Sequence, residues 1–410
     1  MGRKLIILGN GFDLASGLKS SYYDFFLQRI SPQLMKYFDY SYKFFEENFS
    51  SDNRYWFDTF LKVREYDRSL KPRGKLILDS NSNKHKIYEI LQNSNLTFWD
   101  LIFYFSKNHK LLENYDWQDV ERKMLEFLNT PENRLEIPSL KQINYLTEGL
   151  RGNIATLLCL HLAYYLPKRE KEYSKENLID YLYDELILFE NSFSAYINSI
   201  SDESYQKVAK EKILRISGKS LADCNDKIFS FNYTDPFSMY GLDIVNVHGK
   251  AKVNTILFGI DQEAISPASQ GYRFTKTFRQ MTETKLAKNY KDNIFPDKTT
   301  TEEIAFFGHS LSDLDYSYFQ TIFDYYDVYN SHVRLAFYYE TYGNKTNKDM
   351  ELDLAKKISQ MLYAYSPSID NEKKGRNLLH KLLLEKRLII EELPNNVWYN
   401  WEVEKWKDGG

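Results

Sequence analysis

The chain of 410 residues is poor in cysteine and has no long apolar run. Its two cysteines, Cys159 and Cys224, cannot form a disulfide framework, and with the scattered histidines they match no zinc-site spacing. The longest apolar stretch, residues 154–166, contains His161 and is too short to span a membrane. The apolar start of the chain ends at Leu8 and leads into glycines, unlike a signal peptide. We therefore expect a cytoplasmic protein with no metal site.

An excess of positive charge is also missing. The chain carries 54 Lys and Arg against 57 Asp and Glu, a net charge of −3. Dedicated nucleic-acid and membrane-surface binders are strongly basic, so neither kind of partner is expected. Tyrosine (33) and phenylalanine (27) are abundant by contrast. They recur at helical spacing beside Leu and Ile, which indicates compositional bias rather than a base-stacking surface.

Short apolar runs bounded by polar or glycine-containing turns predict the strands. They lie at residues 5–8, 227–232, 244–247, 255–258, 304–307, 333–338 and 387–391. Uninterrupted apolar runs of this length are typical of parallel strands that are covered on both faces. The expected fold class is α/β, with an open parallel sheet.

Between the first and second predicted strands the pattern changes to helical periodicity. The helical segments lie near residues 88–91, 98–105, 120–128, 153–165 and 178–200. The sequence therefore predicts a sheet domain made of residues 1–21 and 223–410. A helical domain, residues 22–222, is expected to be inserted after the first strand and helix.

Four turns with ligand-type residues follow predicted strands. They read GNGFD (residues 9–13), FNYTD (231–235), NVHGK (246–250) and GHSLSDLD (308–315). In an open parallel sheet, ligands bind at the carboxyl ends of the strands. All four turns would lie along that edge, which predicts a single cleft for a nucleotide.

The chemistry of these turns is complementary. Gly9 and Gly11 allow a sharp turn and a close approach to phosphate, ahead of a helix with unpaired N–H groups. The Asn232 amide can donate and accept hydrogen bonds, and so hold a water or a ribose hydroxyl. His248 is of the residue type that titrates near neutral pH, as general acid–base catalysis requires.

Each residue also has a structural explanation. A histidine at a strand end can be structural, and Asn232 can be a turn former. Any of Ser310, Ser312 and Asp313 can cap the following helix. Adjacent side chains on an extended chain point apart, so His309 and Ser310 are not expected to form a catalytic dyad. The shared position of four independent turns is what favours function.

The same segments resemble two known families. LIILGNGFDLASGL, FNYT with VHG, FFGHSLSDLD and the central NYDWQDVE (residues 114–121) resemble the bacteriophage abortive-infection AbiH family over most of the chain. The sheet alone is similar, more distantly, to sirtuin-like NAD-binding domains. The implied fold is a Rossmann-like, sirtuin-like open parallel sheet with a large all-helical insertion.

The sirtuin-like resemblance implies roles for individual residues. Asn232 and His248 match its catalytic Asn and the His of its His-Gly motif. Asp13 stands where the first motif has Ser, and Thr234 stands where the Asn turn has Asp. The residues implied to bind the cofactor are Gly9, Asn10, Gly11, Phe12, Asp13, Thr234, Gly308, His309, Ser310 and Asp313.

The resemblance implies an anti-phage protein that acts on NAD. Sirtuin-like domains of bacterial defence proteins resemble NAD+ glycohydrolases, which release nicotinamide and ADP-ribose, and the four-cysteine zinc module of deacetylases is absent here. Asn232 would orient a water and His248 would accept a proton. Asp13, Asp235 or Asp261 would face the positive charge on the ribose, as in sugar hydrolysis. Besides the dinucleotide, the expected partners are an unknown phage-derived trigger and further copies of the chain in a homo-oligomer.

Two alternatives stay open. The edge can bind NAD or a related nucleotide without cleaving it, with the helical insertion carrying effector or partner-binding activity, and Thr234 in place of an acid keeps this possibility open. A nuclease is not supported, because no acids cluster as in a metal site. The stretch WQDVE either begins a helix with acids in its first turn or brings Glu121 to the site as a further carboxylate.

Overall fold

The computed structural model describes residues 2–48, 90–91, 93–105, 117–128, 166, 178–284, 294–369 and 372–394. The helix expected at residues 153–165 lies outside these ranges. The chain divides into two compact units, and each is described by itself. The first unit comprises Met1–Ser21, Ser194–Leu257 and Arg279–Gly410, and the second comprises Tyr22–Phe193 and Phe258–Phe278.

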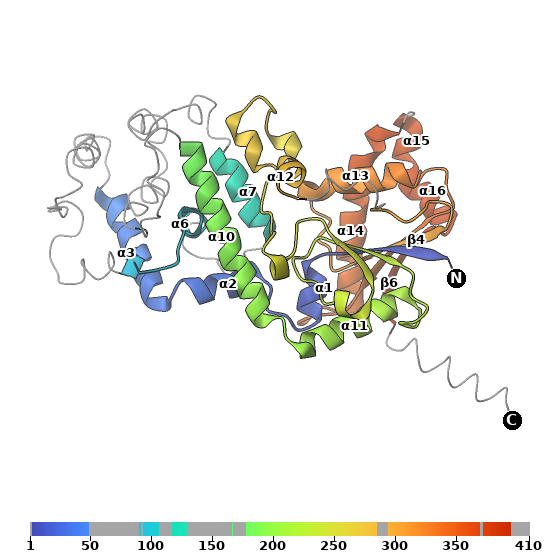
Figure 1. Ribbon diagram of the computed structural model, residues 1–410. Coiled ribbons are helices and arrows are strands. Elements are labelled where there is room, and N and C mark those ends of the chain that lie inside the picture. The colour runs from blue at the N-terminus through green and yellow to red at the C-terminus, as the bar shows by residue number, and fades with distance from the viewer. Residues whose placement is uncertain are drawn as a thin grey trace. The chain divides into compact units, whose positions relative to one another are not determined.

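The first unit contains a six-stranded, all-parallel sheet in the order β3-β2-β1-β4-β5-β6. Figure 1 labels two of its strands, β4 and β6. The strands are β1 (Arg3–Leu8), β2 (Lys227–Ser230), β3 (Asp243–Asn246), β4 (Thr301–Phe307), β5 (Arg334–Tyr339) and β6 (Leu388–Glu392). This is the strand order of doubly wound, Rossmann-like sheets, so the expected fold class is confirmed. The direction of winding reverses between β1 and β4, which is where such sheets bind ligands.

Helices cover both faces of this sheet. They are α1 (Asn10–Ala15), α11 (Glu203–Ser217), α13 (Tyr316–Tyr325), α14 (Asn347–Tyr365) and α16 (Leu378–Leu384). Leu5 and Ile7 of β1 belong to the buried cluster that includes residues of α13, α14 and α16. Ile6 and Leu8 belong to the opposite cluster, which includes residues of α1 and α11. Burial of both faces explains why the strands are uninterrupted apolar runs.

One predicted strand is wrong. Residues 255–258 form no strand but fold back over the end of β3, where Leu257 N donates to His248 O at 2.9 Å. Gly249, with a φ of 82°, makes this return possible, since a Cβ there would lie 1.7 Å from Thr255 O. Backbone groups that a strand would pair in the sheet are used locally instead.

The compact units differ from the predicted domains at two places. Helix α11, expected in the insertion, belongs to the sheet unit because Tyr205 and Ile213 join its core. Segment Phe258–Phe278, expected in the sheet domain, belongs to the second unit. There Phe258 N donates to Glu190 Oε1 at 2.6 Å.

The second unit is helical in its described part. Its helices are α2 (Tyr22–Arg29), α3 (Pro32–Asn48), α6 (Phe98–Phe105), α7 (Trp117–Leu128), α10 (Leu178–Ile200) and α12 (Lys276–Glu283), of which the last two continue into the first unit. Aromatic rings form its core. The ring centroids of Phe25 and Phe193 lie 5.0 Å apart, and those of Phe103 and Phe189 lie 5.5 Å apart. Part of the aromatic abundance is therefore used for packing.

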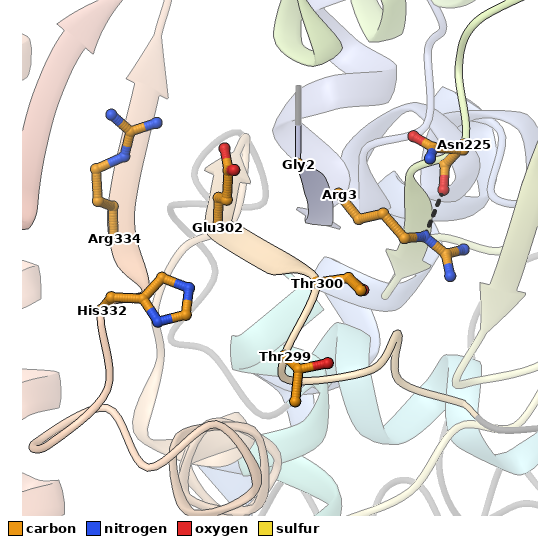
Figure 2. Close-up of a pocket in the computed structure, with 8 residues that line it drawn as sticks. All are labelled: Gly2, Arg3, Asn225, Thr299, Thr300, Glu302, His332 and Arg334. Atoms are coloured by element: carbon orange, nitrogen blue, oxygen red, sulfur yellow. Dashed lines mark hydrogen bonds between the residues drawn. The ribbon is translucent and has the colours of Figure 1, made fainter.

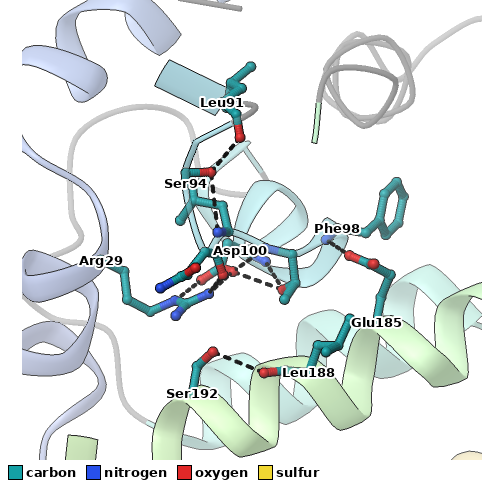
Figure 3. A network of polar contacts seen from close by, with 11 residues as sticks. Arg29, Leu91, Ser94, Phe98, Asp100, Glu185, Leu188 and Ser192 are labelled. Carbon is teal, nitrogen blue, oxygen red and sulfur yellow. Dashed lines mark hydrogen bonds and ion pairs between the residues drawn. The ribbon is translucent and has the colours of Figure 1, made fainter. Parts of the chain in front are cut away.

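Figure 3 shows a buried polar network within the second unit. Arg29 of α2 donates from Nε and Nη2 to the two carboxylate oxygens of Asp100, each at 2.6 Å. Glu185 of α10 accepts from Phe98 N at 2.7 Å. The N–H groups at the start of a helix have no partner inside it, and Glu185 satisfies one of them. The network therefore ties α2 and α10 to the start of α6.

Candidate functional site

The carboxyl ends of four strands meet at one edge of the sheet in the first unit. Leu8 of β1 is paired with Ser230 of β2 and Phe307 of β4, and Ser230 is paired with Asn246 of β3. The turns that follow these residues begin side by side, as the sequence predicts. They carry Gly9, Asn10, Gly11, Phe12, Asp13, Asn232, Thr234, His248, Gly308, His309, Ser310 and Asp313. The binding and catalytic roles of these residues stay predictions.

Glycines let two of these turns pack against each other. A Cβ on Gly9 would lie 2.5 Å from His309 Cα, and a Cβ on Gly11 would lie 2.7 Å from Gly308 O. Gly308 has a φ of 68°, and a Cβ there would lie 2.2 Å from Phe12 N. The Gly-x-Gly spacing thus has a structural reason that needs no ligand, because backbone occupies the space that side chains would take. A phosphate-binding role for the glycines stays a prediction.

Asp13 places a buried carboxyl at this edge, with 2% of the residue exposed. Tyr205 Oη donates to its Oδ1 at 2.7 Å, and Thr234 Oγ1 lies 3.1 and 3.0 Å from Oδ1 and Oδ2. Burial raises the pKa of Asp13 to about 7, although hydrogen bonds from Tyr205, Thr234 and Asn232 lower it. A carboxyl that titrates near neutral pH is typical of functional sites.

Asn232 is held in one orientation. Its Nδ2 donates to Gly9 O at 3.0 Å, and its amide also hydrogen-bonds to Asp13. The amide also has an acceptor atom, Oδ1, which can accept from a further donor. Asn246 donates from Nδ2 to Asn232 O and Thr234 O, each at 2.8 Å, and so fixes the turn after β2.

His248 lies in an aromatic cluster at the same edge and is 4% exposed. Its ring lies edge-to-face with Phe231 and Tyr318, at centroid distances of 5.5 and 5.6 Å. Gln280 of α12 donates from Nε2 to Tyr318 Oη and to Val247 O, each at 2.7 Å. These contacts hold the imidazole in place, as a general base requires.

His309 has structural partners in its own turn. Its Nδ1 accepts from Leu311 N at 3.0 Å, and its Nε2 lies 3.6 Å from Asp315 Oδ2. Leu311 has a φ of 56°, which is a strained, left-handed conformation for leucine. Strained backbone of this kind is concentrated at functional sites, so its presence in the turn after β4 is consistent with a functional site at this edge.

The cap of the next helical turn is Ser312. Its Oγ accepts from Leu314 N at 3.3 Å and so caps the 3₁₀ helix η8 (Asp313–Asp315). Of the three residues considered for this role, Ser310 and Asp313 do not supply the cap.

Asp235 and Asp261, the other two carboxylates expected to face the ribose, have partners elsewhere. Asp235 Oδ2 lies 2.6 Å from Lys250 Nζ, so an ion pair compensates its charge. Asp261 belongs to the second unit, where its Oδ1 accepts from Glu263 N at 2.8 Å.

Glu121 also belongs to the second unit. Its Oε2 forms a buried ion pair with Lys276 Nζ at 2.8 Å. Helix α7 begins at Trp117, in agreement with the interpretation of WQDVE as the start of a helix. A catalytic role for Glu121 stays a prediction.

Sequence reasoning missed Tyr205 and Asn246. Tyr205 lies 192 residues from Asp13 and is one of 33 tyrosines, so no local signal marks it. Burial and the Asp13 charge raise the pKa of Tyr205, so its hydroxyl stays protonated and can donate. Asn246 carried a signal, because it is a polar residue at the end of an apolar strand.

A pocket of about 650 Å³ opens at the opposite end of the sheet, where the strands begin. It is lined by Gly2, Arg3, Asn225, Thr299, Thr300, Glu302, His332 and Arg334. In Figure 2 the Arg3 guanidinium turns toward Asn225 O, at 2.8 Å, and away from Arg334. No predicted site residue lines this pocket, and its charged groups do not converge.

Two further features are missing from the part of the chain that the structure describes. None of its helices has both the length and the apolar character needed to cross a bilayer. Nor do its His, Cys, Asp and Glu side chains form a group of three or more that could hold a metal ion.

Comparison with known proteins gives one match. A family model described as bacteriophage abortive infection AbiH matches residues 5–339. No curated protein and no solved structure matches the chain. The matched range runs from β1 through the end of β5, so it includes the whole candidate site.

Proposed function

The chain belongs to the bacteriophage abortive infection AbiH family, and from this premise we propose that it acts in phage defence as an NAD+ glycohydrolase. The observation that carries the proposal is the position of Asp13, Asn232 and His248. All three lie at the carboxyl edge of a sheet with Rossmann-like strand order, where nucleotides bind in such folds.

The polar groups of this edge fit the chemistry of glycosidic cleavage. Bound NAD+ supplies a ribose–nicotinamide bond whose breakage leaves positive charge on the ribose. Asn232 Oδ1 holds the attacking water, and Asp13 supplies a buried carboxyl beside it. His248 accepts one water proton as the oxygen bonds to the ribose carbon. The electron pair of the broken bond leaves with nicotinamide, so the products are nicotinamide, ADP-ribose and one proton.

Nicotinamide release tests this proposal. The full-length protein is incubated with NAD+, alone and in lysate from phage-infected cells, and nicotinamide is quantified by chromatography. We expect His248→Ala and Asn232→Ala each to lower release by about 100-fold or more, because each removes a group needed in the reaction step. His332→Ala is the matched control, since His332 is exposed at the opposite end of the sheet.

Circular dichroism verifies that the variants are folded. Absence of release under both conditions, or full release by both site variants, would contradict the proposal.

A second candidate function is binding without cleavage. Thr234 favours it, because it stands where an acid is expected in the turn after β2 and has no charge to offer to a reacting ribose. In that case NAD+ raises the melting temperature through linkage but releases no nicotinamide. His248→Ala would then leave defence against phage intact, and the helical unit would carry the effector activity.

A further inference from the structure

The proposed cleavage needs a carboxylate near the positive charge that develops on the ribose, and three were candidates. Asp235 is compensated by Lys250 at 2.6 Å. Asp261 caps a 3₁₀ turn, where its Oδ1 accepts from Glu263 N at 2.8 Å. Asp13 is buried at the strand edge, and among the described residues its side-chain contacts are hydroxyl and amide groups, with no cation. Its charge is therefore available to a cationic transition state, and the low-dielectric surroundings strengthen that interaction.

The donors around Asp13 fix where its carboxyl points. Tyr205 approaches from α11 with an Oη to Oδ1 distance of 2.7 Å. Thr234 approaches from the turn after β2, at 3.0 Å from Oδ2. A carboxylate has about four acceptor positions, and the donors Tyr205, Thr234 and Asn232 take three of them, which leaves one for a ligand. The Asn232 amide bonds to the same carboxyl, which links Asp13 to the residue proposed to hold the water.

We propose that Asp13 is the carboxylate that stabilises the positive charge of the cleavage step, and that Tyr205 and Thr234 are positioning residues that hold it beside Asn232. This inference rests on the proposed function. It adds Tyr205, which no sequence motif marks, to the residues of the site.

A consequence for pH follows from the hydrogen bonds. The hydroxyls of Tyr205 and Thr234 donate to the ionised carboxyl and so lower the pKa of Asp13 against the effect of burial. Asp235 acts on Tyr205, raising its pKa, and is itself paired with Lys250. Loss of the Tyr205 hydroxyl is therefore expected to raise the pKa of Asp13.

The experiment compares Tyr205→Phe with Tyr365→Phe in the full chain. Both tyrosines are buried and donate to an aspartate, Tyr205 to Asp13 at 2.7 Å and Tyr365 to Asp324 at 2.8 Å. We expect Tyr205→Phe to shift the acidic limb of the kcat/KM profile about one unit toward higher pH. At pH 7 this lowers kcat/KM about fivefold, with recovery near pH 9, because less of Asp13 is ionised. Tyr365→Phe should leave the profile unchanged.

A second measurement does not depend on activity. Carbon-13 NMR of aspartate-labelled protein follows the Asp13 carboxyl, assigned by its loss in Asp13→Asn. We expect its titration to move to higher pH in Tyr205→Phe and in Thr234→Val. If Tyr205→Phe does not fold, Thr234→Val supplies the same test.

The outcomes separate the two proposals. If the wild type releases no nicotinamide, the proposed function fails, and so does the role of Asp13 in cleavage. If the wild type cleaves NAD+ and folded Asp13→Asn keeps full activity instead of losing about 100-fold, only the inference on Asp13 is overturned. An Asp13 titration that is unchanged in both hydroxyl variants overturns the positioning role of Tyr205 and Thr234.

Discussion

Single residues determine the chemistry of the strand edge, and Asp13 also makes the stability of the fold depend on pH. Burial raises the pKa of Asp13 from its ordinary value of 3.8 to about 7, so the folded chain binds this proton more tightly than the unfolded chain. The contribution of this carboxyl to the free energy of unfolding of the protein is therefore highest below pH 4. It falls as pH rises from about 4 to about 7, by an amount on the order of 2–4 kcal/mol.

Asp13→Asn tests this coupling without reference to activity. The amide does not titrate, so we expect the variant to lose most of this decline and to be more stable than the wild type at pH 8. Urea denaturation at pH 4, 6 and 8 measures the difference. Asp324→Asn, an exposed acid bonded to Tyr365, is the control and should keep the decline. If the unfolding free energy of the wild type instead increased relative to that of Asp13→Asn as the pH rises, this coupling between Asp13 and stability would be refuted.

At the scale of secondary-structure elements, two turns at this edge pack backbone against backbone. The turn after β1 packs on the turn after β4, and Gly11 N donates to Gly308 O at 2.8 Å. This contact brings the start of α1, and with it Asp13, next to the winding reversal between β1 and β4. The position of the carboxyl therefore depends on glycines that themselves carry no functional group.

Two glycine substitutions isolate the close approach. Gly308→Ala places a Cβ 2.2 Å from Phe12 N at a φ of 68°, whereas Gly343→Ala has a φ of 58° and nothing within 4 Å. Both carry left-handed strain of about 1–2 kcal/mol, but only Gly308→Ala must displace a turn. We expect Gly308→Ala to lose at least about 2 kcal/mol more unfolding free energy than Gly343→Ala. Equal losses in chemical denaturation would show that the packing of the turns contributes nothing.

The molecule as a whole is nearly balanced in charge, with 54 basic and 57 acidic residues. Non-specific binding to DNA depends on cationic side chains that release counterions from phosphates. We expect a Kd for duplex DNA weaker than about 100 μM at physiological salt, measured by fluorescence anisotropy. Micromolar binding with a steep dependence on salt would contradict this and would reopen a nucleic-acid role.

Sequence patterns predicted most of the sheet, because a strand buried on both faces is a short apolar run wherever it lies. Residues 5–8 and 304–307 are such runs, and both are strands. Residues 255–258 have the same pattern but do not pair with any strand of the sheet. The backbone N–H of Leu257 bonds instead to His248 O, a contact that the residue pattern does not record. Likewise, the periodicity of α11 indicates a buried face but does not say which core it joins.

The order of strands and turns along the chain was enough to place Gly9, Asn232, His248 and Gly308 at a common edge, because parallel strands end on the same side. The surroundings of each side chain required the folded molecule. Tyr205 meets Asp13 across 192 residues of chain, and the burial that raises the pKa of Asp13 comes from packing of α11 and the turn after β2. Local residue patterns record neither a contact between distant segments nor the solvent that folding removes.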